Sequence, residues 1–143
     1  MRLMGVDLGD RRTGLAIGDD GMRIASPLDV IEVPRARLGE LVRVIAERAR
    51  AEGVGRIVVG LPLNMDGTEG PMAARSRAFG AALAEASGIE VAYQDERLTS
   101  AEADWEMAGS GLTHGQKKAR RDALAAAAIL RDAFAAMGPG PTE

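Results

Sequence analysis

The sequence predicts an α/β domain built on a mixed five-stranded sheet with helices on both faces. Three observations support this prediction. Three strand-like segments open the chain, and the pair Asp20-Gly21 between the second and third is typical of a hairpin turn. Apolar residues at helical spacing follow, and strands and helices then alternate to residue 137. An antiparallel meander followed by such crossovers gives a mixed sheet.

The first four elements follow from local pattern. Strands are predicted over residues 2–8, 12–19 and 22–33, the third weakened near Pro27. The next segment, residues 37–52, places apolar residues at every third or fourth position and is expected to end as a helix at Gly53.

The second half of the chain alternates more regularly. A nearly continuous apolar run at residues 56–61 is typical of a central strand covered on both faces. The remaining predicted elements are a helix from Pro71 to about residue 86, a strand over 89–94, a short helix over 100–108 and a long helix over 117–137. The order βββαβαβαα is that of an RNase H-like domain.

Length and composition limit the classes of protein that remain. A chain of 143 residues suits one domain, which we place at residues 1–137, with a flexible Gly/Pro-rich tail over 138–143. The absence of cysteine excludes disulfides, zinc–cysteine sites and thiol nucleophiles. No apolar run approaches a membrane span and the N-terminus lacks a secretory pattern, so we expect no membrane partner and a cytoplasmic protein.

The net charge of −3 argues against a general polyanion binder, but basic residues are clustered. Local clusters of this kind can hold phosphates even on an acidic protein. We therefore expect nucleic-acid contacts from Arg11, Arg12, Lys117, Lys118 and Arg121.

Asp7 is the first candidate for chemistry. It ends an apolar strand, with Gly5 before it and Gly9 after it, where a sheet edge has room for phosphate. Carboxylate oxygens suit a hard cation such as Mg²⁺. The same Asp-x-Gly pattern occurs in actin-like ATPases and sugar kinases, and a solvated turn is the simpler alternative.

The segment from Gly60 to Pro71 follows the buried strand directly. It is rich in turn residues, and the next helix would present its N-terminal N–H groups to a phosphate. A plain loop with a helix cap is equally plausible. We expect Asn64 and Thr68 to contact nucleic acid.

Two carboxylates follow the fifth strand. Alternate residues of a strand face opposite sides, so Asp95 and Glu96 do not both face one metal. We choose Glu96 as the ligand and assign Asp95 to a supporting position or to pairing with Arg97, itself a candidate for nucleic-acid contact.

Asp122 lies near the start of the long helix. It shares a helical face with Lys118, Ala125, Ala126 and Ile129, whose small members let the helix approach the sheet. Taken alone, a solvated helix start is the better interpretation. Three acids at element ends that meet at one sheet edge favour a joint site instead. His114, the single histidine, is expected in a mobile loop that contacts substrate.

These motifs together resemble the YqgF/RuvX family over residues 1–135. The resemblance lies in Gly5-x-Asp7-x-Gly9, Gly60-Leu61-Pro62 through Gly70, Asp95-Glu96-Arg97-Leu98 and Asp122-x-x-Ala125-Ala126. The resemblance implies an RNase H-like fold of the RuvC type. It also implies Asp7, Glu96 and Asp122 as catalytic, metal-binding acids, with two ions of Mg²⁺ or Mn²⁺ as the cofactor. Members of the family are described as Holliday-junction resolvases and as nucleases that mature the 5′ end of 16S rRNA precursor.

The resemblance leaves several points open. RuvC-type sites carry two acids three residues apart on the last helix, and here Ala125 stands at that spacing. The site is therefore expected to be a set of three acids, unless Asp95 or Asp10 contributes a fourth. The substrate is branched DNA or precursor rRNA, and two symmetric cuts favour a homodimer. The alternatives are a non-catalytic RNase H-like module that binds nucleic acid and, less favoured because no second domain fits, an actin-like ATPase or kinase fragment.

Overall fold

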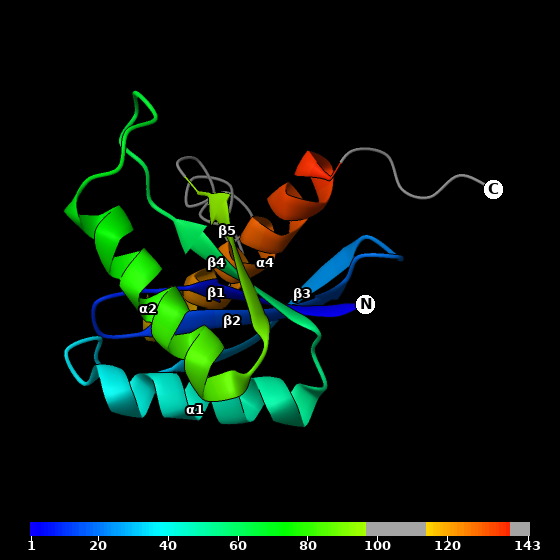
Figure 1. Ribbon diagram of the computed structural model, residues 1–143, viewed down its shortest axis with the longest axis horizontal. Helices are drawn as coiled ribbons and strands as arrows, with labels where there is room; N and C mark the ends of the chain where they lie inside the picture. Colours follow the sequence, from blue (N-terminus) through cyan, green and yellow to red (C-terminus); the bar gives the residue numbers. More distant parts are fainter. Residues whose placement is uncertain (97–113, 138–143) are drawn as a thin grey trace.

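Five strands form one mixed sheet in the computed structural model, which describes residues 1–96 and 114–137, with side chains in the last helix from residue 120 onward. The sheet order is β3-β2-β1-β4-β5 (Figure 1). β1 pairs antiparallel with β2, β2 pairs antiparallel with β3, and β4 runs parallel to both β1 and β5. The predicted meander and mixed sheet are confirmed. The strands are β1 (Arg2–Asp7), β2 (Thr13–Asp19), β3 (Ile24–Ile31), β4 (Arg56–Leu61) and β5 (Glu90–Asp95).

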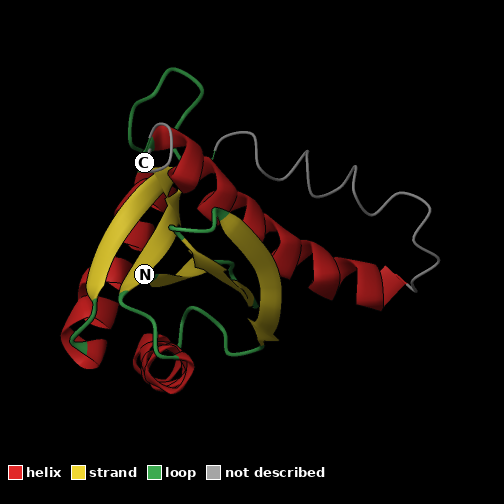
Figure 2. Ribbon diagram, turned by 90° about the vertical axis from the view of Figure 1, so that its right-hand side faces the viewer, coloured by secondary structure: helices red, strands yellow, loops and turns green. Residues whose placement is uncertain are grey.

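Helices cover both faces of this sheet (Figure 2). Within the described residues, α1 (Leu38–Glu52) and α2 (Pro71–Ser87) lie on one face and α4 (His114–Ala136) on the other. Gly53 ends α1 as predicted, with a φ of 70° in the left-handed region that favours glycine. None of the described helices is both long and apolar enough to cross a membrane.

The boundary of the last helix differs most from its prediction. α4 begins at His114 and not at residue 117, so the expectation that His114 lies in a loop is wrong. Gly115 lowers helix propensity locally, but residues added to an existing helix each gain a backbone hydrogen bond. The helix predicted over 100–108 and the tail over 138–143 lie outside the described residues.

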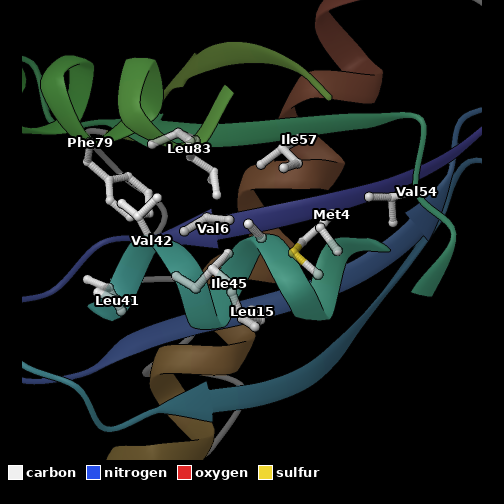
Figure 3. Close-up of a cluster of buried hydrophobic side chains, with 13 residues drawn as sticks. Met4, Val6, Leu15, Leu41, Val42, Ile45, Val54, Ile57, Phe79 and Leu83 are labelled. Carbon is white, nitrogen blue, oxygen red and sulfur yellow. The ribbon is translucent and has the colours of Figure 1, made fainter. Parts of the chain in front are cut away.

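The larger core lies between the sheet and the α1–α2 layer (Figure 3). Met4 and Val6 of β1 face this layer and are fully buried, as are Ile45 of α1 and Phe79 of α2. Since strand residues alternate between faces, Leu3, Gly5 and Asp7 must turn toward α4. The alternation of β1 therefore decides the face on which its terminal carboxylate lies.

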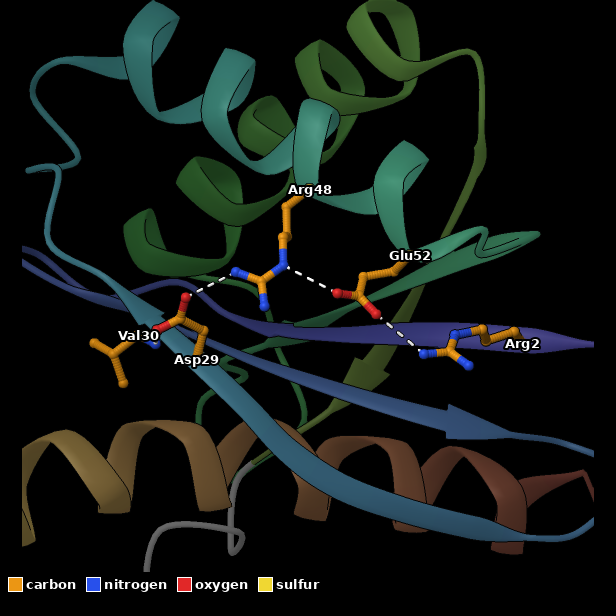
Figure 4. Close-up of polar contacts among 5 residues, drawn as sticks. All are labelled: Arg2, Asp29, Val30, Arg48 and Glu52. Carbon is orange, nitrogen blue, oxygen red and sulfur yellow. Dashed lines mark hydrogen bonds and ion pairs between the residues drawn. The ribbon is translucent and has the colours of Figure 1, made fainter.

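A surface network ties α1 to the sheet (Figure 4). Arg48 donates from Nη1 to Asp29 of edge strand β3 at 2.8 Å and from Nε to Glu52 at 3.1 Å. Glu52 in turn accepts from Arg2 of β1 at 3.0 Å. These contacts lie on the α1 side of the sheet, away from Asp7.

Candidate active site

The α4 face of the sheet gathers the three predicted acids at one edge. Asp7 is the last residue of β1, Glu96 directly follows β5, and Asp122 lies in α4. The Glu96 N–H donates to the carbonyl of Leu61 at 3.3 Å, which extends the β4–β5 pairing by one residue. That extension, with strand alternation, places Glu96 on the same face as Asp7.

Two glycines make room for this arrangement. Gly14 pairs with Asp7 in the β1–β2 register, and a Cβ at Gly14 would lie 1.9 Å from the backbone oxygen of Asp122. A Cβ at Gly60 would lie 2.7 Å from Oε2 of Glu96. Helix α4 therefore packs directly against the backbone of Gly14, and the Glu96 carboxyl packs directly against the backbone of Gly60. The sequence indicated close approach through the alanines of α4, but the role of Gly60 beneath Glu96 was not anticipated.

Asp7 and Glu96 are joined by a hydrogen bond between their side chains. Burial, followed by the nearby charge of Asp7, raises the pKa of Glu96 to about 9. Glu96 is therefore protonated at neutral pH and donates to the Asp7 carboxylate. Burial also raises the pKa of Asp7, although the hydrogen bond from Glu96 opposes this shift. Two carboxyl groups in contact retain a proton because two negative charges so close together would repel each other.

Asp122 is the third acid of this group. Its negative charge raises the pKa of Asp7, so the two carboxylates are close enough to interact. Its Oδ2 lies 3.2 Å from Nε of Arg12. Within residues 1–96 and the described part of α4, no three metal-ligating side chains are close enough together to hold an ion. The structure thus brings Asp7 and Glu96 together and leaves Asp122 beside them, bound to arginine.

The chemistry of these donors fits a divalent cation. Asp7, Glu96 and Asp122 offer oxygen ligands, which hard cations such as Mg²⁺ and Mn²⁺ accept. The shifted pKa values of Asp7 and Glu96 show that negative charge is unfavourable there without a cation. A cation would remove the need for the proton on Glu96.

The two candidates for a fourth acid point elsewhere. Asp10 accepts at its backbone oxygen from the N–H of Arg35 at 2.8 Å and at Oδ1 from Arg35 Nη2 at 3.2 Å. Asp95 lies one residue before Glu96 and, by alternation, faces the α2 side with Tyr93. Its charge still contributes to the raised pKa of Glu96. A contribution of either acid to the site stays a prediction.

A cavity of about 580 Å³ opens beside Asp122. Two predicted nucleic-acid contacts, Arg11 and Arg12, line it, whereas Glu32 was not anticipated. Arg121 precedes Asp122 in α4 and is half-buried. The described residues that line it are Gly9, Asp10, Arg11, Arg12, Glu32 and Asp122.

The loop between β4 and α2 projects beyond the sheet (Figure 1) and is bonded to itself. Asn64 donates from Nδ2 to Thr68 Oγ1 at 2.9 Å, and that hydroxyl donates to Asp66 Oδ1 at 2.6 Å. The two predicted nucleic-acid contacts in this loop therefore hold its shape. Arg97 and the side chains of Lys117 and Lys118 lie outside the described residues.

Comparison with protein families gives one match over nearly the whole chain. The RuvX family model, described as Holliday junction resolvase, matches residues 1–136. A protein of Anaeromyxobacter sp. (strain Fw109-5) named "Putative pre-16S rRNA nuclease" is 46% identical over 131 residues, which are 92% of this chain and 94% of that protein. A protein of the same name from Pelotomaculum thermopropionicum is 41% identical over 138 residues, 96% and 89% of the two chains.

Solved structures share the fold at lower identity. RuvC of T. thermophilus in complex with a Holliday junction substrate gives a TM-score of 0.58 at 20% identity, over 96% of both chains. Fowlpox virus resolvase with Holliday junction DNA gives a TM-score of 0.61 at 10% identity, over 97% of this chain and all of the other. These similarities confirm the predicted RNase H-like fold of the RuvC type.

Proposed function

The chain belongs to the RuvX family, and on that premise we propose that it is a nuclease that hydrolyses phosphodiester bonds in structured nucleic acid. In this proposal the nuclease uses two divalent cations, either Mg²⁺ or Mn²⁺. Asp7, Glu96 and Asp122 would hold them. The proposal also places the enzyme in the cytoplasm, together with the nucleic acid that it would cut.

One observation carries the catalytic part of this proposal. Asp7 and Glu96 are half-buried in contact with each other, and Asp122 adds a third charge beside them. Burying neighbouring carboxyl groups costs stability unless a cation or proton compensates. A module that only binds nucleic acid would gain nothing from neighbouring carboxyl groups that lower its stability. The arrangement therefore favours an enzyme over the non-catalytic alternative and over a kinase fragment.

Each residue of the site would have a separate role in the proposed reaction. A divalent cation bound here would supply an activated water and stabilise charge on the phosphate. Glu96 would give up its proton when the cation binds, and Asp7 would then face the cation together with it. Because they lack side chains, Gly14 and Gly60 leave space for Asp122 and Glu96 to lie close to Asp7. Gly14 contacts the α4 backbone at Asp122, and Gly60 contacts the Glu96 carboxyl.

Substrate contacts come from the neighbouring cavity. Arg11 and Arg12 would hold phosphates there, because a guanidinium pairs two N–H groups with phosphate oxygens. Candidate substrates are precursor 16S rRNA, from the names of the relatives, and a four-way DNA junction, from the family description. Both carry the same phosphodiester. Paired cuts on a junction would require a homodimer, which light scattering of the purified protein would detect.

The test compares both substrates with matched variants. Asp7→Asn should abolish cleavage in Mg²⁺ of whichever substrate the wild type cuts, while leaving the fold and substrate binding largely intact. Asp29→Asn is the control, because it makes the same chemical change on β3 at the α1 side of the sheet. Cleavage by Asp7→Asn at the wild-type rate would refute the assignment.

A further inference from the structure

The ion pair between Arg12 and Asp122 engages a carboxyl oxygen that the third acid could otherwise offer to a cation. Nε of Arg12 lies 3.2 Å from Oδ2 of Asp122, and the two side chains are 20% and 28% exposed. Both line the cavity of about 580 Å³ beside the site. The pair is therefore reachable by a ligand that enters this cavity.

This pairing competes with cation binding in two ways. The oxygen of Asp122 that faces the guanidinium is less available as a ligand, and the positive charge of Arg12 repels a cation. Consistent with this, the described residues contain no group of three ligands close enough to hold an ion, although the charge of Asp122 reaches Asp7.

The backbones on both sides of the pair are held in place. α4 rests on Gly14, where a Cβ would lie 1.9 Å from the Asp122 oxygen. The turn before Arg12 is tight, since a Cβ at Gly9 would lie 2.1 Å from the Arg12 carbonyl oxygen, and Arg35 hydrogen-bonds to Asp10 in the same turn. A change of partner at this point therefore involves side chains and leaves the fold unchanged.

We propose that Arg12 is a positioning residue that exchanges partners, binding Asp122 in the free protein and a substrate phosphate in the complex, which frees Asp122 for the cation. The inference rests on the proposed nuclease function and assigns a coupling to its site. A guanidinium binds a carboxylate and a phosphate with the same pair of N–H groups, so either partner satisfies it. Both side chains are partly exposed, so water can reach the pair and the arginine can change partner without leaving a buried charge uncompensated.

The exchange makes cation and nucleic acid bind cooperatively. Phosphate binding at Arg12 raises the affinity for the cation, and by linkage the cation raises the affinity for nucleic acid by the same factor. A coupling of about five-fold or more lies in the range typical of linked sites.

Two measurements on the purified protein test this coupling. Calorimetry gives the Mn²⁺ affinity of the free protein, and fluorescence anisotropy gives the affinity for a labelled four-way DNA junction in EDTA and in Ca²⁺ at equal ionic strength. The variants are Arg12→Ala and Arg12→Met, the second of which keeps most of the aliphatic stem. Arg11→Ala is the matched control, because it removes the same charge from the same cavity and leaves the ion pair in place.

We expect both Arg12 variants to bind Mn²⁺ about five-fold or more tightly than Arg11→Ala does. The gain in junction affinity from Ca²⁺ should be present in the wild type and in Arg11→Ala and absent in the Arg12 variants. Arg12 variants that bind Mn²⁺ like Arg11→Ala, or that keep the Ca²⁺ gain, would overturn the exchange while leaving the nuclease assignment intact. A wild type that binds no Mn²⁺ would overturn the metal site and the exchange together.

Discussion

Glu96 donates a hydrogen bond to Asp7 across the ends of β5 and β1, with the bare backbone of Gly60 beneath it. The contact joins residues 89 positions apart in the sequence (96 − 7). It also means that the protein without metal retains a proton in its candidate active site at neutral pH.

The stability of the metal-free protein should fall as the pH rises. Burial raises the pKa of Glu96 from an ordinary 4.5 to about 9 in the folded state, so folding holds this proton more tightly than the unfolded chain does. The associated stability is fully present below about pH 4.5 and is lost progressively up to about pH 9. Glu96→Gln removes this titration and retains a donor to Asp7. It should exceed the wild type in free energy of unfolding by on the order of 3 kcal/mol at pH 7.

Urea unfolding in EDTA at pH 5, 7 and 9 measures this difference, which should grow with pH. Glu47→Gln, an exposed change on α1, is the control and should follow the wild-type profile. A constant difference between Glu96→Gln and wild type across the three pH values would contradict the prediction.

Cation binding should release a proton. Since Glu96 is protonated at neutral pH and must be ionised to bind a cation, Mg²⁺ affinity should increase with pH up to about 9. Calorimetry at pH 7 in buffers of different ionisation enthalpy should show release of about one proton per site, and the melting temperature should rise with Mg²⁺ concentration. Mg²⁺ binding without proton release would show that Glu96 is not a ligand. Chelation by EDTA should reverse the gain in melting temperature.

A side chain at position 60 should displace Glu96 and so lower both the stability of the protein and its affinity for Mg²⁺. In Gly60→Ala the new Cβ would lie 2.7 Å from Glu96 Oε2 and 2.6 Å from Cδ1 of Ile129, so both must move. Such overpacking costs about 1–3 kcal/mol and should also weaken Mg²⁺ binding. Gly39→Ala in α1 is the control, because nothing lies within 4 Å of its Cβ and alanine favours the helix. Unchanged melting temperature and Mg²⁺ affinity in Gly60→Ala would contradict the geometry.

The core on the opposite face should affect stability alone. Phe79 is fully buried between α2 and the sheet, and Phe79→Ala should cost about 3–5 kcal/mol in the free energy of unfolding. Mg²⁺ affinity of the folded protein should be unchanged, since the acids lie on the α4 face. Met22→Ala, at a side chain that is 71% exposed, should leave both quantities unchanged. A Phe79→Ala protein that remains folded but loses Mg²⁺ binding would show that the two faces are coupled.

Sequence alone determined the elements and the face on which two of the acids lie. Hydrophobic periodicity depends on neighbours within one element, so it predicted the five strands and the main helices with boundaries within about three residues. Alternation along a strand is equally local, and it correctly separated Glu96 from Asp95. Neither rule involves contacts between distant segments.

Only the tertiary structure decided which groups touch. The pairing of Arg12 with Asp122, the glycine beneath Glu96 and the self-bonded loop at Asn64 all depend on distances between elements. A clustered set of basic residues indicated phosphate contacts for Arg12, but local pattern could not show that a carboxylate already binds it. The reason is physical: periodicity reports which side of an element is buried, whereas a site depends on where separate elements meet in space.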